Sequence, residues 1–217
     1  TMMTAVKTPV EITALRKAGK ILAETLRDLE RRIEPGVSPK SLSKKAGNLI
    51  RNKGGEPVFF GYHGFPEPIC ISINDEVVHG IPRDTVSIRE GDVVSLDLGV
   101  RYKGMIVDSA ITVVCGKTTP EVEHLLEYTK RSLDAGIGVV CDGVRTGDIG
   151  AAIEAVLKAA KLGIVRDLVG HGVGHDIHEE PNIPNYGRKN TGATLQSGMT
   201  VAIEPMATLG KEAVFTD

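Results

Sequence analysis

Residues 170–181 contain the residue types in this chain that most directly suggest chemistry. Three of the six histidines, His171, His175 and His178, lie there among glycines and before two glutamates and a proline. Imidazole binds metals and transfers protons near neutral pH, and glycine lets the backbone approach a bound ion or substrate closely. The helical zinc signature His-Glu-x-x-His is a poor match, because the glycines disfavour a helix and the glutamate is absent. The segment therefore predicts a metal site whose other ligands lie elsewhere in the chain.

The three histidines are not expected to share one role. In an extended segment His171 and His175 lie on one face, and His178 lies on the other face unless the chain turns. An isolated histidine is more often structural than functional, but the glycine setting favours functional roles for His171 and His178. His79, at the end of a predicted strand and directly before Gly80, is a fourth candidate.

Three acidic residues are candidates for the missing ligands. Asp97 and Glu204 each interrupt an apolar run, which is costly in a buried strand unless the charge is paired or metal-bound. A turn centred between residues 102 and 103 would place Asp108 directly opposite Asp97, with Cβ atoms about 4.5–5.5 Å apart. A bulge at Gly104 would shift this register. One such acid alone is more often exposed or a salt-bridge partner, but two carboxylates this close repel unless a cation separates them. The three acids together therefore favour a divalent metal.

Capping signals and apolar spacing predict the elements that position these residues. Helices are expected to begin at Thr8-Pro9, Ser38-Pro39, Thr119-Pro120 and Thr146, and to end near Pro35, Gly54, Gly143 and Leu162. Strands are expected at 69–73, 92–98, 105–114, 164–169 and 200–203.

Two parts of this plan are related by a shift of 107 residues. The text around Gly36 matches that around Gly143, and residues 91–97 match residues 198–204 at the same shift. This shift places Asp97 and Glu204 at equivalent positions. Coincidence between two ordinary helix–strand units is the alternative. If the match is a duplication, we expect an α/β (α+β) fold of two pseudo-twofold halves, with one curved antiparallel sheet and helices packed on its outer face.

The composition is that of an ordinary globular chain, with 217 residues, 41% hydrophobic and 25% charged, and a net charge of −2. It has no long basic run, no apolar stretch that could span a bilayer and no signal-peptide pattern, so neither nucleic-acid nor membrane binding is expected. Cys70, Cys115 and Cys141 are too dispersed for a disulfide framework and favour a reducing compartment. A cytoplasmic enzyme is the expectation.

From about residue 9 to its end, the chain resembles the type I methionine aminopeptidases. The matching text includes Gly61-Tyr62-x-Gly64-Phe65-Pro66, Cys70-x-Ser72-x-Asn74, Val78-His79-Gly80-Ile81-Pro82, Gly91-Asp92, Asp97, Asp108, Gly170-His171-Gly172-Val173-Gly174, His178-Glu179-Glu180-Pro181, and Gly198-Met199-Thr200 before Ile203-Glu204-Pro205. The resemblance implies the pseudo-symmetric pita-bread fold, in a single catalytic domain with halves at about 9–116 and 119–217. It also implies removal of the initiator methionine from new proteins when the second residue is small.

The resemblance further implies specific roles for the candidate residues. Asp97, Asp108, His171 and Glu204 correspond to ligands of two divalent ions, with Asp108 bridging; cobalt, manganese, iron and zinc all suit such mixed ligands. His79, His178 and Glu204 correspond to catalytic residues, and both histidines also contact substrate. The methionine side chain needs a narrow apolar pocket, for which Tyr62, Phe65 and Cys70, beside Phe59 and Phe60, are candidates. The implied partners are nascent N-termini, with the ribosome nearby and the enzyme a monomer.

One ligand of the family pattern has no counterpart here. The family's second bridging acid is a glutamate on a strand after Glu204, and the sequence ends at Asp217 before reaching it. We therefore expect residues 1–217 to lack that strand and, by themselves, to have weak or absent activity. A prolidase- or creatinase-like hydrolase and a non-catalytic peptide-binding relative of the same fold are the alternative functions.

Overall fold

The computed structural model describes residues 2–216, whose contacts divide into two units. The first unit comprises residues 9–118 and 175–177, and the second unit comprises residues 2–8, 119–174 and 178–216. Each combines helices with antiparallel strands, as expected for the α/β class. No helix among the described residues is long and apolar enough to cross a membrane.

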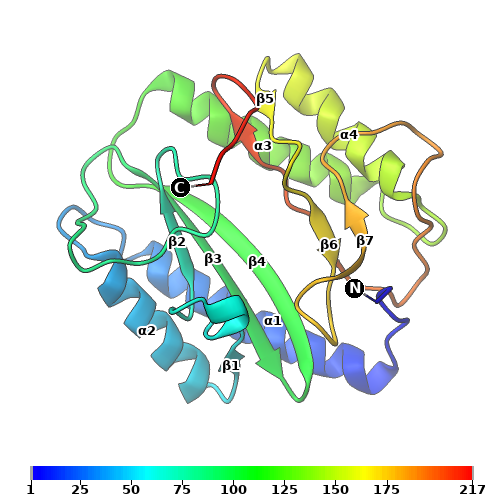
Figure 1. Cartoon of the computed structure of the whole chain (residues 1–217), viewed down its shortest axis with the longest axis horizontal. Coiled ribbons are helices and arrows are strands. Elements are labelled where there is room, and N and C mark those ends of the chain that lie inside the picture. The colour runs from blue at the N-terminus through cyan, green and yellow to red at the C-terminus, as the bar shows by residue number, and fades with distance from the viewer. Residues whose placement is uncertain (1, 217) are drawn as a thin grey trace. The chain divides into compact units, whose positions relative to one another are not determined.

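The first unit places two helices beside a four-stranded antiparallel sheet (Figure 1). Its helices are α1 (Pro9–Glu30) and α2 (Pro39–Asn52), followed by β1 (Glu56–Pro57), the 3₁₀ turn η1 (Tyr62–Gly64), β2 (Cys70–Ile73), β3 (Val93–Tyr102) and β4 (Met105–Val114). Helix α1 packs against β3 and β4. Apolar residues recur in α1 at helical spacing and are buried, and Leu22 and Leu29 join Leu96 and Leu98 of β3 in the core.

The hairpin between β3 and β4 has a different register from the one predicted. Tyr102 pairs with Met105, so the turn residues are Lys103 and Gly104. Both have positive φ, 48° and 81°, as a two-residue type I′ turn requires. The predicted direct pair of Asp97 with Asp108 is therefore wrong: Asp97 lies opposite Ala110, and Asp108 lies opposite Gly99.

The second unit also combines paired helices with short strands. Its elements are α3 (Pro120–Gly138), α4 (Thr146–Ala159), β5 (Gly163–Ile164), β6 (Gly170–Gly172), β7 (Glu179–Ile183), β8 (Val201–Ala202) and β9 (Ala207–Thr208). Strand β6 lies between β7 and β8, and β5 pairs with β9. Helices α3 and α4 lie side by side (Figure 1). Gly136 permits this approach, since a Cβ there would lie 2.9 Å from a side-chain carbon of Ile153.

Several predicted boundaries in the second unit differ from the structure. Helix α4 is capped by Arg145, whose N–H donates to the Asp148 carboxylate (3.0 Å), while Thr146 is already helical. The helix ends at Ala159 and does not reach Leu162. The strands predicted at 164–169 and 200–203 form ladders of only two residues, β5 and β8. The other residues of both predicted strands lie in loop segments.

The same local structure occurs twice at the predicted spacing of 107 residues. Both bounds of α4 follow those of α2 by this amount (146 − 39 and 159 − 52). The N–H of Gly36 donates to the Ile88 carbonyl at 2.8 Å, and the N–H of Gly143 donates to the Leu195 carbonyl at 2.8 Å. Both glycines have positive φ, 93° and 82°. The sequence match therefore reflects matching backbone structure.

Candidate functional site

Strand β6 holds His171 between two neighbouring strands that approach closely. A Cβ at Gly170 would lie 2.3 Å from the Ala202 carbonyl oxygen of β8, and one at Gly172 would lie 2.5 Å from the Glu180 carbonyl oxygen of β7. Glycine on both sides of the histidine therefore allows the three strands to pair. His171 itself is buried, with 7% of its surface exposed.

The hydrogen bonding of His171 leaves a lone pair facing a carboxylate. Its Nδ1 lies 2.8 Å from the Gly172 carbonyl oxygen, and because a carbonyl only accepts, Nδ1 carries the proton of the neutral ring. Its Nε2 is then an acceptor, and it lies 3.0 Å from Oε1 of Glu204. This oxygen is buried and receives no hydrogen bond from any described residue. A proton on Nε2 or a metal ion between the two atoms stabilises such a contact, and a pair of one imidazole and one carboxylate fits a divalent metal.

Asn185 fixes the backbone of Glu204. The asparagine is fully buried, and its Nδ2 donates a hydrogen bond to the Glu204 carbonyl oxygen at 2.8 Å. The Glu204 side chain is about one-third exposed (37%) although its Oε1 is buried, so the residue is held at its backbone and partly accessible at its side chain. Sequence reasoning missed Asn185, which lies in an ordinary Pro-Asn-Tyr context with no metal-ligand spacing.

His178 lies next to His171 in the second unit. The two imidazole rings are 4.4 Å apart between centroids and meet edge to face, at 67°. The chain bends between β6 and β7 instead of continuing as a strand, which is the turn needed to bring both histidines together. His178 is exposed, so its ring is accessible to a substrate.

The first unit brings Asp97, Asp108 and Cys70 together. Cys70 on β2 is the cross-strand partner of Asp97 on β3. Asp108 lies opposite Gly99, two residues along β3 from Asp97, so both carboxylates are on one face of the sheet and about 7–8 Å apart at Cα. Both aspartates are half-buried. Burial and then the charges of Asp97 and Asp108 raise the pKa of the Cys70 thiol, which therefore stays protonated at neutral pH.

His79 lies in a loop that is fixed to β2, and not at the end of a strand as predicted. The Gly80 N–H donates to Ser72 Oγ at 3.0 Å, and the Ile71 N–H donates to the Gly80 carbonyl oxygen at 2.9 Å. A Cβ at Gly80 would lie 2.3 Å from the Ile71 carbonyl oxygen, so only glycine fits there. His79 has a positive φ of 60° and is exposed. Its side chain is thus presented by a constrained backbone.

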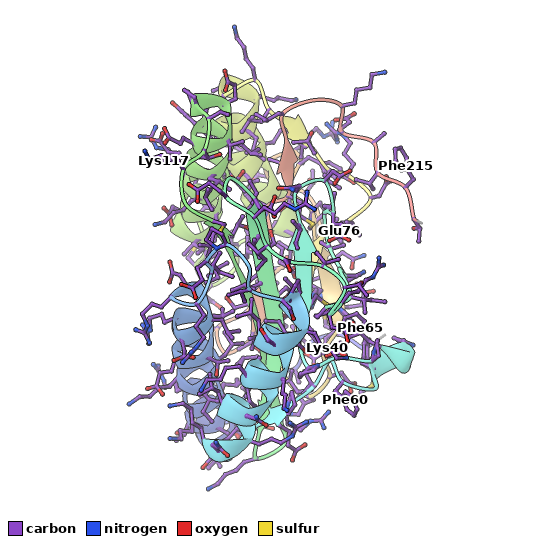
Figure 2. All side chains as sticks on the ribbon, turned by 90° about the vertical axis from the view of Figure 1, so that its left-hand side faces the viewer. Lys40, Phe60, Phe65, Glu76, Lys117 and Phe215 are labelled. Atoms are coloured by element: carbon purple, nitrogen blue, oxygen red, sulfur yellow. The ribbon has the colours of Figure 1, made fainter. Side chains whose placement is uncertain are left out.

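The aromatic segment 59–65 is divided between core and surface. Phe59 is buried. Phe65 is half-buried and Phe60 is exposed (Figure 2). Tyr62 stands at the surface of η1, where partial burial and the charge of Asp176 raise its pKa. Phe60 lines an open hollow of about 560 Å³ that also contains three basic side chains of α2 and does not include Tyr62, Phe65 or Cys70. That charged hollow does not suit a methionine side chain.

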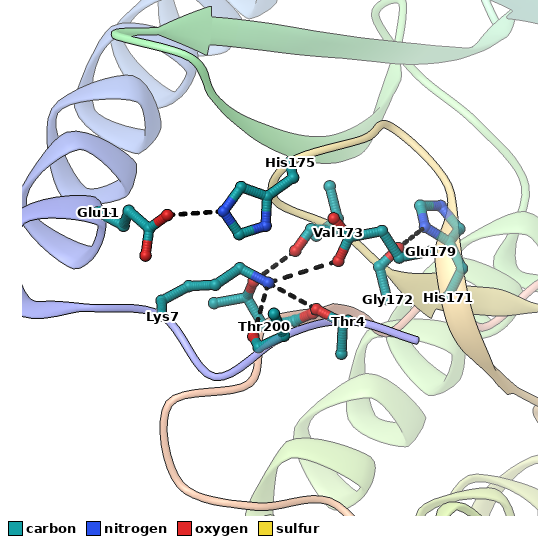
Figure 3. A network of polar contacts seen from close by, with 10 residues as sticks. Thr4, Lys7, Glu11, His171, Gly172, Val173, His175, Glu179 and Thr200 are labelled. Carbon is teal, nitrogen blue, oxygen red and sulfur yellow. Dashed lines mark hydrogen bonds and ion pairs between the residues drawn. The ribbon is translucent and has the colours of Figure 1, made fainter. Parts of the chain in front are cut away.

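His175 has a different environment from the other two histidines of its segment. Its Nε2 lies 2.6 Å from Oε1 of Glu11 on α1 (Figure 3). His175 thus pairs with an acid of the first unit, whereas His171 and His178 lie beside each other in the second unit.

Known proteins match nearly the whole chain. The sequence pattern of metallopeptidase family M24 matches residues 13–216. Methionine aminopeptidase 1 of Bacillus subtilis is 42% identical over 210 residues, covering 97% of this chain and 84% of that protein. The crystal structure of methionine aminopeptidase from Thermotoga maritima aligns with a TM-score of 0.97 and 38% identity, covering 99% of this chain and 86% of that one. Prolidase from Pyrococcus furiosus aligns with a TM-score of 0.79 and 25% identity, covering 92% of this chain and 57% of the prolidase chain.

Proposed function

This chain belongs to metallopeptidase family M24, and we propose that it removes the N-terminal methionine from polypeptides whose second residue is small. The fold class expected from the sequence, the pita-bread fold, is confirmed by the likeness to methionine aminopeptidase and prolidase structures. The observation that carries the proposal is the His171–Glu204 pair, in which Nε2 of the buried histidine lies 3.0 Å from a buried carboxylate oxygen, within the residues that match the family. The family uses divalent metal.

The proposed metal ligands are Asp97 and Asp108 of the first unit and His171 and Glu204 of the second. Three carboxylates and one imidazole suit manganese, iron, cobalt or zinc, and two ions with Asp108 bridging are part of the proposal. A bound divalent ion supplies Lewis-acid activation of a water and of the scissile carbonyl. The family resemblance and the acceptor pair at His171 support this set.

The chain's own side chains have distinct proposed tasks around the scissile bond. His178, exposed beside His171, donates a hydrogen bond to the carbonyl oxygen as negative charge develops there. His79, presented by the fixed loop at Gly80, orients the substrate amide. Glu204, with a partly exposed side chain, takes a proton from the attacking water and passes it to the departing amine. Tyr62, Phe65 and Cys70 contact the methionine side chain.

The proposed substrates also define where the protein acts. Nascent polypeptide N-termini are its partners, so the proposal places the protein in the cytoplasm, close to ribosomes and without direct contact to nucleic acid or membrane. A monomer is sufficient in this proposal, because the four ligands that are present and both histidines come from one chain.

A peptide panel with the full-length protein tests the function. With Mn²⁺ or Co²⁺ added, we expect release of methionine from Met-Ala-Ser at a rate at least ~10-fold above that from Met-Leu-Ser, because a small site excludes the larger second residue. Acetylated Met-Ala-Ser is the control and should release none, since it lacks the free amine. Preference for Ala-Pro-Ser would instead identify a prolidase, and metal binding without any hydrolysis would identify a non-catalytic relative; either result overturns the proposal.

A further inference from the structure

A buried lysine, Lys7, lies in the second unit, close in space to Gly174 and Glu179. The side chain of Lys7 is 0% exposed, and its Nζ lies 3.4 Å from Oε2 of Glu179, whose side chain is 5% exposed. Nζ also donates to Thr4 Oγ1 at 2.7 Å and to the Ala5 carbonyl oxygen at 2.9 Å. All three ammonium protons thus have acceptors, as a buried lysine requires. Figure 3 shows Nζ at the centre of these contacts.

The residues around Lys7 form a strap, residues 2–7, that is bound to three parts of the second unit. Met3 pairs with Glu180 of β7, and the Glu180 N–H donates to the Met2 carbonyl oxygen at 2.8 Å. The Lys7 N–H donates to the Gly198 carbonyl oxygen at 2.9 Å. The strap therefore links β7 to the segment that leads into β8.

The same strap reaches the segment that follows His171. Thr4 Oγ1 donates to the Thr200 carbonyl oxygen at 3.3 Å, and Thr200 Oγ1 donates to the Val173 carbonyl oxygen (Figure 3). A Cβ at Gly174 would lie 2.4 Å from Cε of Lys7, so the glycine leaves room for the lysine stem. The strap thus contacts the chain on both sides of the bend between β6 and β7.

We propose that Lys7 is a positioning residue for His178. Glu179 directly follows His178, and its buried carboxylate is held by Lys7, whose other two hydrogen bonds fix the strap. In this proposal the hydrogen bonds of the Lys7 ammonium group, and not its charge alone, fix the position at which β7 begins. The start of β7 in turn fixes where the His178 ring lies against His171. The catalytic part of this inference rests on the proposed function of His178; the positioning part does not.

Two substitutions separate positioning from charge compensation. In Lys7→Met the cation 3.4 Å from Glu179 is lost, and we expect a lower thermal midpoint and a kcat for Met-Ala-Ser that falls ~10- to 100-fold, with KM changed less than ~3-fold. In the double variant Lys7→Met with Glu179→Gln no uncompensated charge remains, so stability should recover. Its kcat should stay low, because the Nζ hydrogen bonds are still missing.

Histidine NMR supplies a readout that needs no activity. With histidine-labelled protein, the ring signals of His171 and His178 should shift or broaden in both Lys7 variants. The matched control is Arg101→Met, which removes an exposed ion pair with the same 3.4 Å separation from Glu56 and should change neither kcat nor these signals. If the double variant regains wild-type kcat and ring signals along with its stability, the proposal is overturned. If the wild-type protein releases no methionine, the proposed function fails, and the ring signals alone decide whether Lys7 positions His178.

Discussion

Glu204 combines a side-chain oxygen beside His171 with a backbone carbonyl held by the buried amide of Asn185. The tautomer of His171 follows from one contact, between Nδ1 and the Gly172 carbonyl oxygen. Asn185 therefore holds the backbone of the acid, and the Gly172 carbonyl oxygen orients the imidazole. In a neutral ring Nε2 of His171 and Oε1 of Glu204 are both acceptors, and a cation between them stabilises the pair.

Replacing Asn185 by alanine should weaken this arrangement. The Glu204 carbonyl would lose its buried donor, so the free energy of unfolding should fall by about 1–3 kcal/mol. Affinity for Mn²⁺ should fall about 10- to 100-fold, as for other partners that orient a ligand. Urea unfolding and calorimetric titration measure the two effects. Asn182→Ala, at an exposed position of β7, is the control; equal losses in both variants would contradict the role given to Asn185.

At the scale of single residues, the sequence indicated the residues that could bind a metal but not the neighbours that fix their positions. His171 and Glu204 are conspicuous because imidazole and buried carboxylates are costly without a function. Lys7 and Asn185 have no such mark, since lysine and asparagine are usually exposed. Their burial depends on contacts with residues more than 15 positions away, which no local pattern contains.

The β3–β4 hairpin shows how one turn decides a register. The two-residue turn at Lys103 and Gly104 shifts the pairing by two positions from the predicted one, which moves Asp108 from opposite Asp97 to a diagonal position. Because the shift is an even number, both carboxylates stay on the same face of the sheet. Asp97 and Asp108 are therefore close on one face of the sheet, as predicted, although the predicted register was wrong.

Gly104→Val tests the type I′ turn directly. Nothing lies within 4 Å of a Cβ built at Gly104, and its φ is 81°, so the cost comes from backbone conformation alone. We expect a loss of about 1–2 kcal/mol in the free energy of unfolding, measured by urea denaturation. Lys103→Asn should cause no loss, because asparagine tolerates positive φ. A fully stable Gly104→Val variant would contradict the assigned turn.

Asp148 makes the start of α4 sensitive to acid. The N–H groups of Asn190 and Arg145 donate to its carboxylate at 2.8 and 3.0 Å and hold its pKa below the ordinary value. A lowered pKa means that the stabilisation is complete above the unfolded-state pKa and is lost as pH falls through the folded-state pKa. Asp148→Ala should therefore lower Tm by about 2–4 °C at pH 7 and by less near pH 3. Equal Tm differences at both pH values, measured by calorimetry, would contradict this role.

Helix positions were predicted better than strand positions. The starts of α1, α2 and α3 follow from Thr-Pro or Ser-Pro pairs, whose cap and fixed φ act locally. The strands of the second unit were predicted too long, because segments such as 164–169 contain strand-favouring residues but pair with a neighbouring strand over only part of their length. Strand length depends on which segment pairs, and that information is not local.

At the scale of the whole molecule, two units repeat one local plan. Helices α2 and α4, and the hydrogen bonds of Gly36 and Gly143, recur at a spacing of 107 residues. The repeat gives Asp97, on β3, and Glu204, two residues after β8, equivalent positions in the sequence. The recurrence of this local structure was therefore visible in the sequence, because glycines with positive φ tolerate few replacements.

The central claim is that His171, with Glu204 and the two aspartates, binds a divalent metal. Calorimetric titration of chelator-treated full-length protein with Mn²⁺ tests it most directly. We predict that the wild-type protein and His175→Ala bind Mn²⁺ with similar affinity, since His175 pairs with Glu11. His171→Ala should lose ~100-fold or more in affinity, because loss of a ligand exceeds the cost of losing an outer partner. No Mn²⁺ binding by the wild-type protein, or equal losses in both histidine variants, would contradict the claim.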